Sequence, residues 1–67
     1  MKKSIAERLK EYRLNHNLTQ LEMANTLGVS IKTYNDLENS RANPNTDTID
    51  KLSKLLKLTY KTIRESL

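Results

Sequence analysis

The sequence predicts an all-α fold of five short helices, formed as a single domain over residues 1–67. Three observations support this prediction. Apolar residues recur at helical spacing in successive segments, and residues that cap helix N-termini precede these segments. The chain contains one glycine and one proline, which is too few for the many turns of a sheet protein. No linker, repeat or low-complexity segment divides the chain.

The first helix is expected to begin after Ser4, because Ser4 and Glu7 have the spacing of a capping box. Asn17 is expected to end it, since asparagine adopts the left-handed conformation more readily than most residues with a side chain. The residues between them place an apolar stripe on one side of the helix, formed by Ile5, Ala6, Leu9 and Tyr12.

The next two helices are predicted to lie close together in the chain. Thr19 and Glu22 form a second capping box, so a helix begins at Gln20, and Gly28 ends it because glycine adopts the left-handed conformation without steric cost. Ser30 then caps the following helix. Two helices joined by so short a turn cross steeply, which is the arrangement that projects the second helix into the DNA major groove. The residues expected to face inward are Leu21, Met23, Ala24, Leu27, Tyr34 and Leu37.

Two further helices are predicted after Pro44. Either Asn45 or Thr46 caps the first of them, and Thr59 caps the second. The inward residues of the first are Ile49, Leu52, Leu55 and Leu56, and the apolar positions of the second are Tyr60, Ile63 and Leu67.

The residue types exclude several classes of protein. The chain has no cysteine, so neither a disulfide framework nor a thiolate metal site is available. Its longest apolar stretches are dipeptides, which excludes a membrane span and the core of a signal peptide, and we expect a soluble, cytoplasmic protein. The one histidine, His16, stands without a cysteine nucleophile, a glycine-rich phosphate loop or a metal-spaced cluster. This pattern argues against an enzyme, a cofactor or a bound metal.

The formal net charge of +4 is spread evenly along the chain. Residues 1–45 hold seven basic and five acidic side chains, and residues 46–67 hold five and three. This distribution predicts only moderate non-specific attraction to nucleic acid, so binding would depend on local contacts. Lys2 and Lys3 form either a basic arm or an ordinary solvated terminus.

The order of these motifs resembles the helix-turn-helix family of phage repressor and Cro proteins, also called XRE-like. The matching residues lie at positions 8–13, 18–20, 22–24, 27–30, 34, 37–39, 41–44 and 58–59. The resemblance implies a five-helix, lambda-repressor-like domain that binds double-stranded DNA as a two-fold dimer and regulates transcription. Two positions depart from the family, because Asn17 and Ser40 stand where members commonly have glycine.

The third helix has an outward polar face on a helical wheel of about 100° per residue. Tyr34 and Leu37 face the core, and the helix N-terminus is the part that reaches deepest into a groove. A polar outward face is also typical of any surface helix, but with the resemblance we interpret it as a face that reads DNA. The expected base-reading residues are Ile31, Lys32, Thr33, Asn35 and Asp36.

These residue types suit the edges of base pairs. Lys32 can donate to guanine, and Asn35 can pair with adenine if it reaches that far. Asp36 can accept from the amino group of cytosine, while Ile31 or the methyl group of Thr33 can contact a thymine methyl. Because phosphates repel a carboxylate, Asp36 is expected to contribute selectivity rather than affinity.

A second set of residues is expected to contact the DNA backbone. Gln20 lies in the first turn of its helix, where free amides and the positive dipole end attract a phosphate. The resemblance adds Ser30, Asn39, Arg41 and Asn43, which fix the register without reading sequence. For Arg41 and Asn43, a solvated loop is the alternative interpretation. The resemblance also pairs Arg13 with Glu38 in a partly buried ion pair that aligns the recognition helix, with a secondary role near phosphate.

The sequence is therefore interpreted as a transcriptional repressor that binds a palindromic operator as a homodimer. Tyr60, Ile63 and Leu67 are expected to form the dimer seam, although they also fit a docking face for another protein or the edge of the core. The alternative function is a protein-binding module of the same fold, an anti-repressor or antitoxin that complexes another regulator. Ile31 keeps this alternative open, because an exposed isoleucine is also a good interface anchor.

Overall fold

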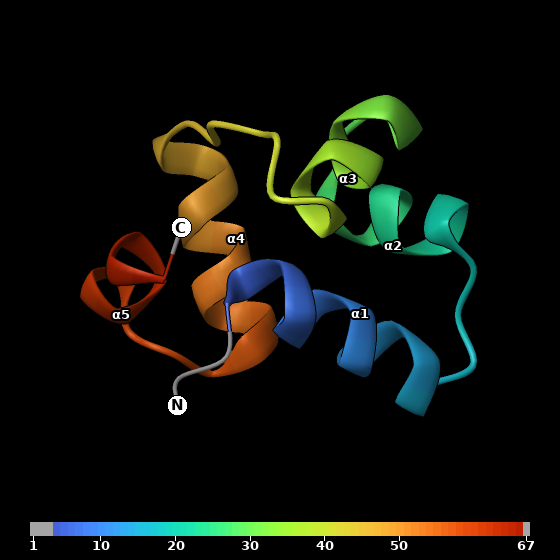
Figure 1. Ribbon diagram of the computed structural model, residues 1–67, viewed down its shortest axis with the longest axis horizontal. Helices are drawn as coiled ribbons and strands as arrows, with labels where there is room; N and C mark the ends of the chain where they lie inside the picture. Colours follow the sequence, from blue (N-terminus) through green and yellow to red (C-terminus); the bar gives the residue numbers. More distant parts are fainter. Residues whose placement is uncertain (1–3, 67) are drawn as a thin grey trace.

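The computed structural model describes residues 4–66 and has five helices and no strand within them. The helices are α1 (Ile5–Asn15), α2 (Gln20–Leu27), α3 (Ile31–Glu38), α4 (Thr46–Leu56) and α5 (Tyr60–Glu65) (Figure 1). The predicted all-α fold is confirmed. Lys2, Lys3 and Leu67 lie outside the described residues.

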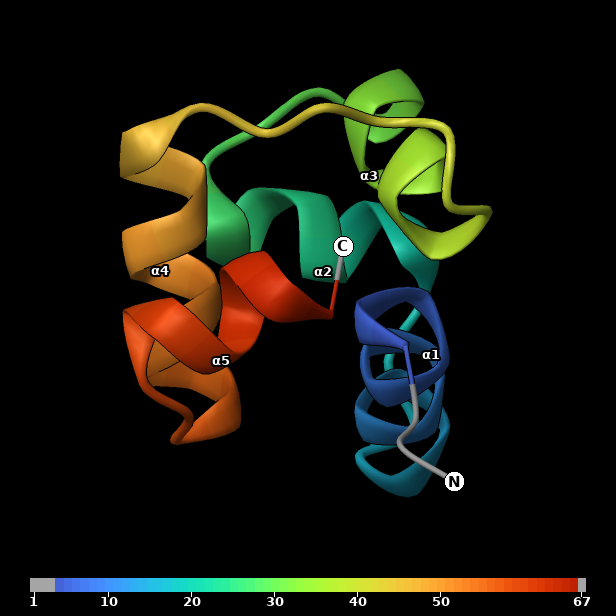
Figure 2. The same ribbon diagram turned by 60° about the vertical axis from the view of Figure 1, so that its left-hand side comes forward.

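The five helices form two packed pairs, which are joined by α1 and by a direct contact between α2 and α4. In Figure 1, α2 and α3 stand on one side of the molecule and α4 and α5 on the other, and α1 contacts both α3 and α4. Turning the molecule shows α4 and α5 side by side, with α2 behind them (Figure 2). The backbone amide of Ile5 donates to the carbonyl of Ser66 at 3.3 Å, so the first helix is also tied to the end of the last.

All five helices begin at a side-chain cap, and in each case the capping oxygen accepts from the backbone amide three residues further on. The caps are Ser4, Thr19, Ser30, Asn45 and Thr59, so Asn45 and not Thr46 caps α4. The capping box of Thr19 and Glu22 is complete in both directions. Local sequence therefore determines where the helices start.

A residue in the left-handed conformation follows each of the helices α1 to α4, as predicted for two of them. Gly28 ends α2 with φ = 67°, and Asn17 has φ = 54° just beyond the end of α1. Ser40 and Lys57 also have positive φ values, 59° and 57°. A residue with a side chain is strained there, so these two sites are candidates for stabilising substitution.

The core lies between all five helices and corrects two expectations. Leu21 is 54% exposed, because it lies on the flank of α2 beside the inward residues Met23, Ala24 and Leu27. Ile63 is fully buried in the core of its own chain, so its side chain is not available for the expected dimer seam. The buried core cluster consists of Ile5, Leu9, Met23, Ala24, Leu27, Tyr34, Leu37, Ile49, Leu52 and Ile63, with Tyr12, Leu55 and Leu56 partly buried against it.

Candidate nucleic-acid interface

The outward face of α3 carries the predicted base-reading residues. Tyr34 and Leu37 anchor the helix in the core, so its opposite side faces solvent. The first turn holds three exposed side chains, those of Ile31, Lys32 and Thr33, and Ile31 is 49% exposed. The other two predicted residues, Asn35 and Asp36, belong to the same surface but are half-buried.

Asp36 holds both of the cations predicted to contact DNA beside it. Its carboxylate lies 3.6 Å from Lys32 Nζ and 3.8 Å from Arg41 Nε. The backbone amide of Arg41 also donates to the carbonyl of Asp36 at 2.8 Å, which fixes the loop after α3 against the helix. Sequence reasoning missed this cluster, although the spacing of four residues between Lys32 and Asp36 is a signal for such a pair.

The loop after α3 brings two residues that were predicted to contact the DNA backbone next to α3. Arg41 and Asn43 are exposed, and together with Thr33 and Asp36 they line a surface hollow of about 360 Å³. The remaining members of the set are Ser30, whose hydroxyl caps α3, Asn39, which follows α3, and Gln20, the first residue of α2. The structure therefore gathers all five around α3.

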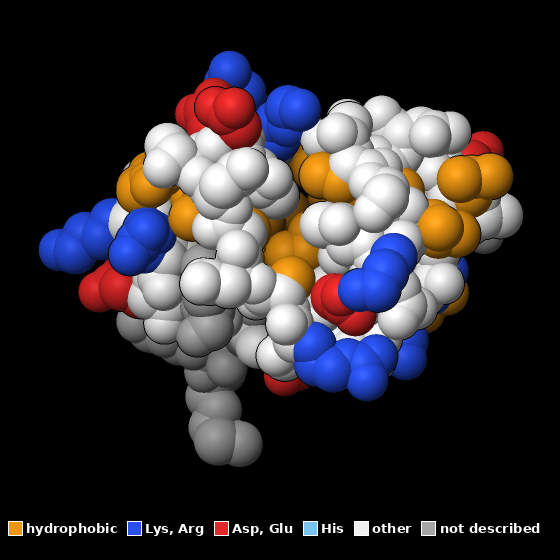
Figure 3. Space-filling model, turned by 90° about the horizontal axis from the view of Figure 1, so that it is seen from above, with side chains coloured by type: hydrophobic (Ala, Val, Ile, Leu, Met, Phe, Trp, Pro, Cys, Tyr) orange, Lys and Arg blue, Asp and Glu red, His pale blue; other side chains and the backbone are white. Residues whose placement is uncertain are grey.

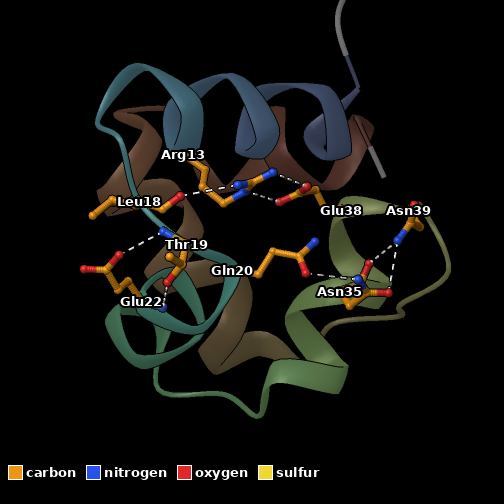
Figure 4. A network of polar contacts seen from close by, with 8 residues as sticks. All are labelled: Arg13, Leu18, Thr19, Gln20, Glu22, Asn35, Glu38 and Asn39. Carbon is orange, nitrogen blue, oxygen red and sulfur yellow. Dashed lines mark hydrogen bonds and ion pairs between the residues drawn. The ribbon is translucent and has the colours of Figure 1, made fainter.

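A chain of side-chain amides joins α2 to α3, and the sequence did not predict it. Asn35 Nδ2 donates to Gln20 Oε1 at 3.4 Å. Asn39 Nδ2 in turn donates to Asn35 Oδ1 at 3.1 Å and to the Asn35 carbonyl at 2.8 Å (Figure 4). The side chain of Asn35 is thus occupied at both ends by protein groups.

The predicted ion pair between Arg13 and Glu38 is present and has fork geometry. Arg13 Nε and Nη2 donate to the two carboxylate oxygens at 3.0 and 3.1 Å, and Nη1 donates to the carbonyl of Leu18 at 3.3 Å (Figure 4). The side chains are 16% and 6% exposed. Burial alone would raise the pKa of Glu38, but hydrogen bonds, that from Arg13 above all, hold this pKa below its ordinary value. The hydrogen bond to Glu38 also raises the pKa of Arg13.

Tyr34 lies beneath this pair. Its ring is fully buried, and its hydroxyl makes no hydrogen bond within the described part of the chain. Burial raises the pKa of Tyr34 well above its ordinary value, and the nearby Glu38 raises it further. α3 is therefore anchored by the buried ring of Tyr34 and by the bidentate ion pair of Glu38 with Arg13.

The surface charge is mixed. On the face shown in Figure 3, basic and acidic side chains stand in small groups around largely uncharged surface. This agrees with the even distribution of charge along the sequence and places the emphasis on individual contacts. No helix in residues 4–66 is long and apolar enough to cross a membrane, and no cluster of metal-ligating side chains is found there.

The glycine turn between α2 and α3, with the polar face of α3 held outward, defines a helix-turn-helix DNA-binding protein. A family model described as helix-turn-helix matches residues 9–63, which include both helices of the motif and reach into α5. The chain therefore belongs to the XRE-type helix-turn-helix family and is a DNA-binding transcription regulator with a lambda-repressor-like fold. A comparison with curated proteins gives no match.

Proposed function

We propose that the protein is a repressor that binds a palindromic operator as a homodimer, with α3 in the major groove. The observation that carries this proposal is the first turn of α3. Ile31, Lys32 and Thr33 are exposed there side by side, on a helix whose opposite side is locked into the core. An anchored helix with a free, mixed polar and apolar tip suits a groove that presents both base edges and thymine methyl groups.

Direct reading is assigned to the three exposed side chains of the first turn and to the half-buried Asp36. Lys32 donates to guanine, Asp36 accepts from cytosine, and Ile31 with the methyl of Thr33 contacts thymine. Because Asp36 holds Lys32 and Arg41 in the free protein, docking exchanges these pairs for contacts with bases and phosphates. The wrong base pair leaves a charged group without a partner, which is the source of selectivity.

The backbone contacts are assigned to the groups that surround α3. Gln20 offers its amide at the start of α2, where free backbone amides also point toward a phosphate. Ser30, Asn39, Arg41 and Asn43 contact the sugar-phosphate chains on either side of the groove. These contacts set the register, while the α3 side chains set the sequence.

The dimer is proposed to form beside α5, through a surface that includes Tyr60. Tyr60 is exposed, whereas Ile63 on the same helix belongs to the core. A two-fold dimer reads two half-sites about one helical turn apart, which gives a domain of this size the specificity that one short helix lacks. No cofactor is needed for this function.

Selection of bound sequences from random duplex DNA tests the proposal, with the oligomeric state measured in parallel. We expect a palindromic site with half-sites about 10 base pairs apart. Lys32→Ala should lose preference at one base pair of each half-site, and the control Lys10→Ala, at an exposed position of α1, should retain it. Repression is then tested with a promoter that overlaps the enriched site. Enrichment of a single, non-palindromic half-site by a monomer would contradict the dimer.

A second candidate function is a protein-binding module that acts on another regulator. The exposed Ile31 favours it, because an apolar side chain at the tip of a recognition helix also suits a protein surface. In that case the selection enriches no sequence, the protein forms a stable complex with a purified regulator, and Ile31→Asp disrupts this complex.

A further inference from the structure

We propose that Asn35 is a positioning residue that orients Gln20 toward the DNA backbone and does not read a base. This inference rests on the proposed DNA-binding function, and it revises the role expected for Asn35. Three side chains carry it: Asn39, Asn35 and Gln20 form one hydrogen-bonded chain across the α2–α3 junction (Figure 4). We call this chain the amide relay.

The direction of the amide relay is fixed by the carboxylate at its end. The Gln20 side chain lies beside the Glu38 carboxylate, which Arg13 already holds (Figure 4). An ionised carboxylate only accepts, so the NH₂ group of Gln20 must face Glu38 and its Oε1 must face away. Oε1 then needs a donor, which Asn35 Nδ2 supplies at 3.4 Å.

The same logic continues to the end of α3. Because Asn35 donates through Nδ2, its Oδ1 is left to accept, and Asn39 Nδ2 donates to it at 3.1 Å. The amide of Asn39 also donates to the Asn35 carbonyl at 2.8 Å, which holds the donor in place. The donors of the relay therefore all run in one direction. Asn39 donates to Asn35, Asn35 donates to Gln20, and the NH₂ group of Gln20 faces Glu38.

Reading adenine would require Asn35 to give up both partners. A bidentate contact with adenine uses Oδ1 and Nδ2 together. In the structure both atoms already bind protein groups, and Asn35 is half-buried between α2 and α3. Adenine would thus replace existing hydrogen bonds rather than add new ones, which leaves little net gain for base recognition.

Orientation of Gln20 is what the relay achieves for binding. A glutamine side chain has three rotatable bonds, and fixing them before docking removes an entropy cost from the bound state. Gln20 stands in the first turn of α2, so a second hydrogen of its NH₂ group is available for the phosphate that the helix N-terminus attracts. Loss of Asn35 should therefore weaken one phosphate contact and leave base preference unchanged.

The test combines variants with neutral methylphosphonate linkages placed one at a time along the selected operator. The phosphate contacted by Gln20 is the position at which the neutral linkage weakens wild-type binding about tenfold but leaves Gln20→Ala binding almost unchanged. At that position we expect the neutral linkage to weaken the binding of Asn35→Ala by less than about threefold. The ranking of base-pair variants should not change. Asn25→Ala, an exposed asparagine of α2, is the matched control and should retain the full penalty.

A second variant separates orientation from packing. Asn35→Asp keeps the shape of the side chain but cannot donate to Gln20 Oε1. The neutral linkage should therefore weaken its binding as little as it weakens that of Asn35→Ala. Thermal melting of both variants checks that each is folded. A full tenfold penalty in both folded variants overturns the proposal, and a changed preference at one base pair restores the base-reading role. If the wild-type protein selects no DNA, the proposed function fails and this inference fails with it, whereas the two preceding outcomes leave DNA binding intact.

Discussion

At the residue scale, Asp36 sets the balance between affinity and selectivity. Its carboxylate forms ion pairs with Lys32 and Arg41 in the free protein, so Asp36→Ala removes a negative charge and leaves both cations free to contact phosphates. We expect affinity for a scrambled duplex to rise about three- to tenfold, while the ranking of operator variants becomes flatter. Fluorescence anisotropy with operator and scrambled duplexes at two salt concentrations measures both effects.

Asp50→Ala provides a matched control for Asp36. Asp50 pairs with Lys54 at 3.2 Å on α4, so this variant also removes a carboxylate from an ion pair four residues apart. It should raise non-specific affinity only slightly and leave the ranking of operator variants as it is. An unchanged ranking in Asp36→Ala would show that Asp36 does not read a base.

Arg13 and Glu38 should behave as one unit in a double-mutant cycle of stability. Because the pair is largely buried and bidentate, removal of one partner leaves the other charge without compensation. We expect Arg13→Met or Glu38→Leu alone to cost about 3 kcal/mol, and the double variant to cost less than the sum of the two. Urea unfolding of the four proteins measures the coupling, and a coupling near zero would contradict the role assigned to the pair.

At the element scale, the helix ends offer two substitutions of opposite sign. Gly28→Ala forces a side chain into φ = 67° and should destabilise the protein by about 1–2 kcal/mol. The added Cβ would lie 2.8 Å from Lys51 Nζ, but that flexible amine can move, so the backbone conformation dominates the cost. Ser40→Gly relieves the same strain at φ = 59° and should stabilise by about 0.5–1 kcal/mol.

Urea unfolding also tests these two substitutions. Ser40→Ala is the control, because it retains the strained backbone while it removes the hydroxyl, and it should be close to neutral. Lys51→Ala should not rescue Gly28→Ala. A neutral Gly28→Ala, or its rescue by Lys51→Ala, would show that contact with the amine and not the φ angle requires glycine.

Features that arise within one helix could be predicted from the sequence, whereas features that arise between helices could not. The capping motifs act over three or four residues, so Thr19, Ser30 and Gly28 reveal their elements without knowledge of the fold. The amide relay depends on contacts between separate elements, which local patterns do not contain, and the same contacts decide between the core and the dimer seam for Ile63. The ion pair of Arg13 and Glu38, 25 residues apart, was predicted only because the family resemblance supplied it.

At the scale of the whole molecule, stability should fall at both ends of the pH range. The pKa of Glu38 lies below its ordinary value of 4.5, so its contribution is present above that value and is lost as pH falls through the lowered pKa. The pKa of Tyr34 lies above its ordinary value of 10.0, so above pH 10 the unfolded chain releases the proton more readily and folding becomes less favourable.

Thermal melting between pH 3 and pH 11 measures this dependence, with a loss of stability expected at both ends. Glu38→Gln should flatten the acid limb, and Tyr34→Phe should flatten the alkaline limb. Tyr34→Phe should otherwise be nearly neutral at pH 7, because the hydroxyl makes no hydrogen bond within residues 4–66. An alkaline limb that persists in Tyr34→Phe would show that Tyr34 is not its source.

The assembly state and the stability of the fold should respond to different residues of α5. Ile63 is buried among residues of several helices, so Ile63→Ala should lower the free energy of unfolding by about 2–4 kcal/mol at every protein concentration. Tyr60 is exposed on the proposed dimer surface, so Tyr60→Ala should leave the melting temperature of the monomer unchanged and weaken self-association. Analytical ultracentrifugation and melting over a range of concentrations separate the two effects, since only a dimer contribution depends on concentration. If Tyr60→Ala associates like the wild type, another surface must join the two copies, and α5 then serves only to close the core.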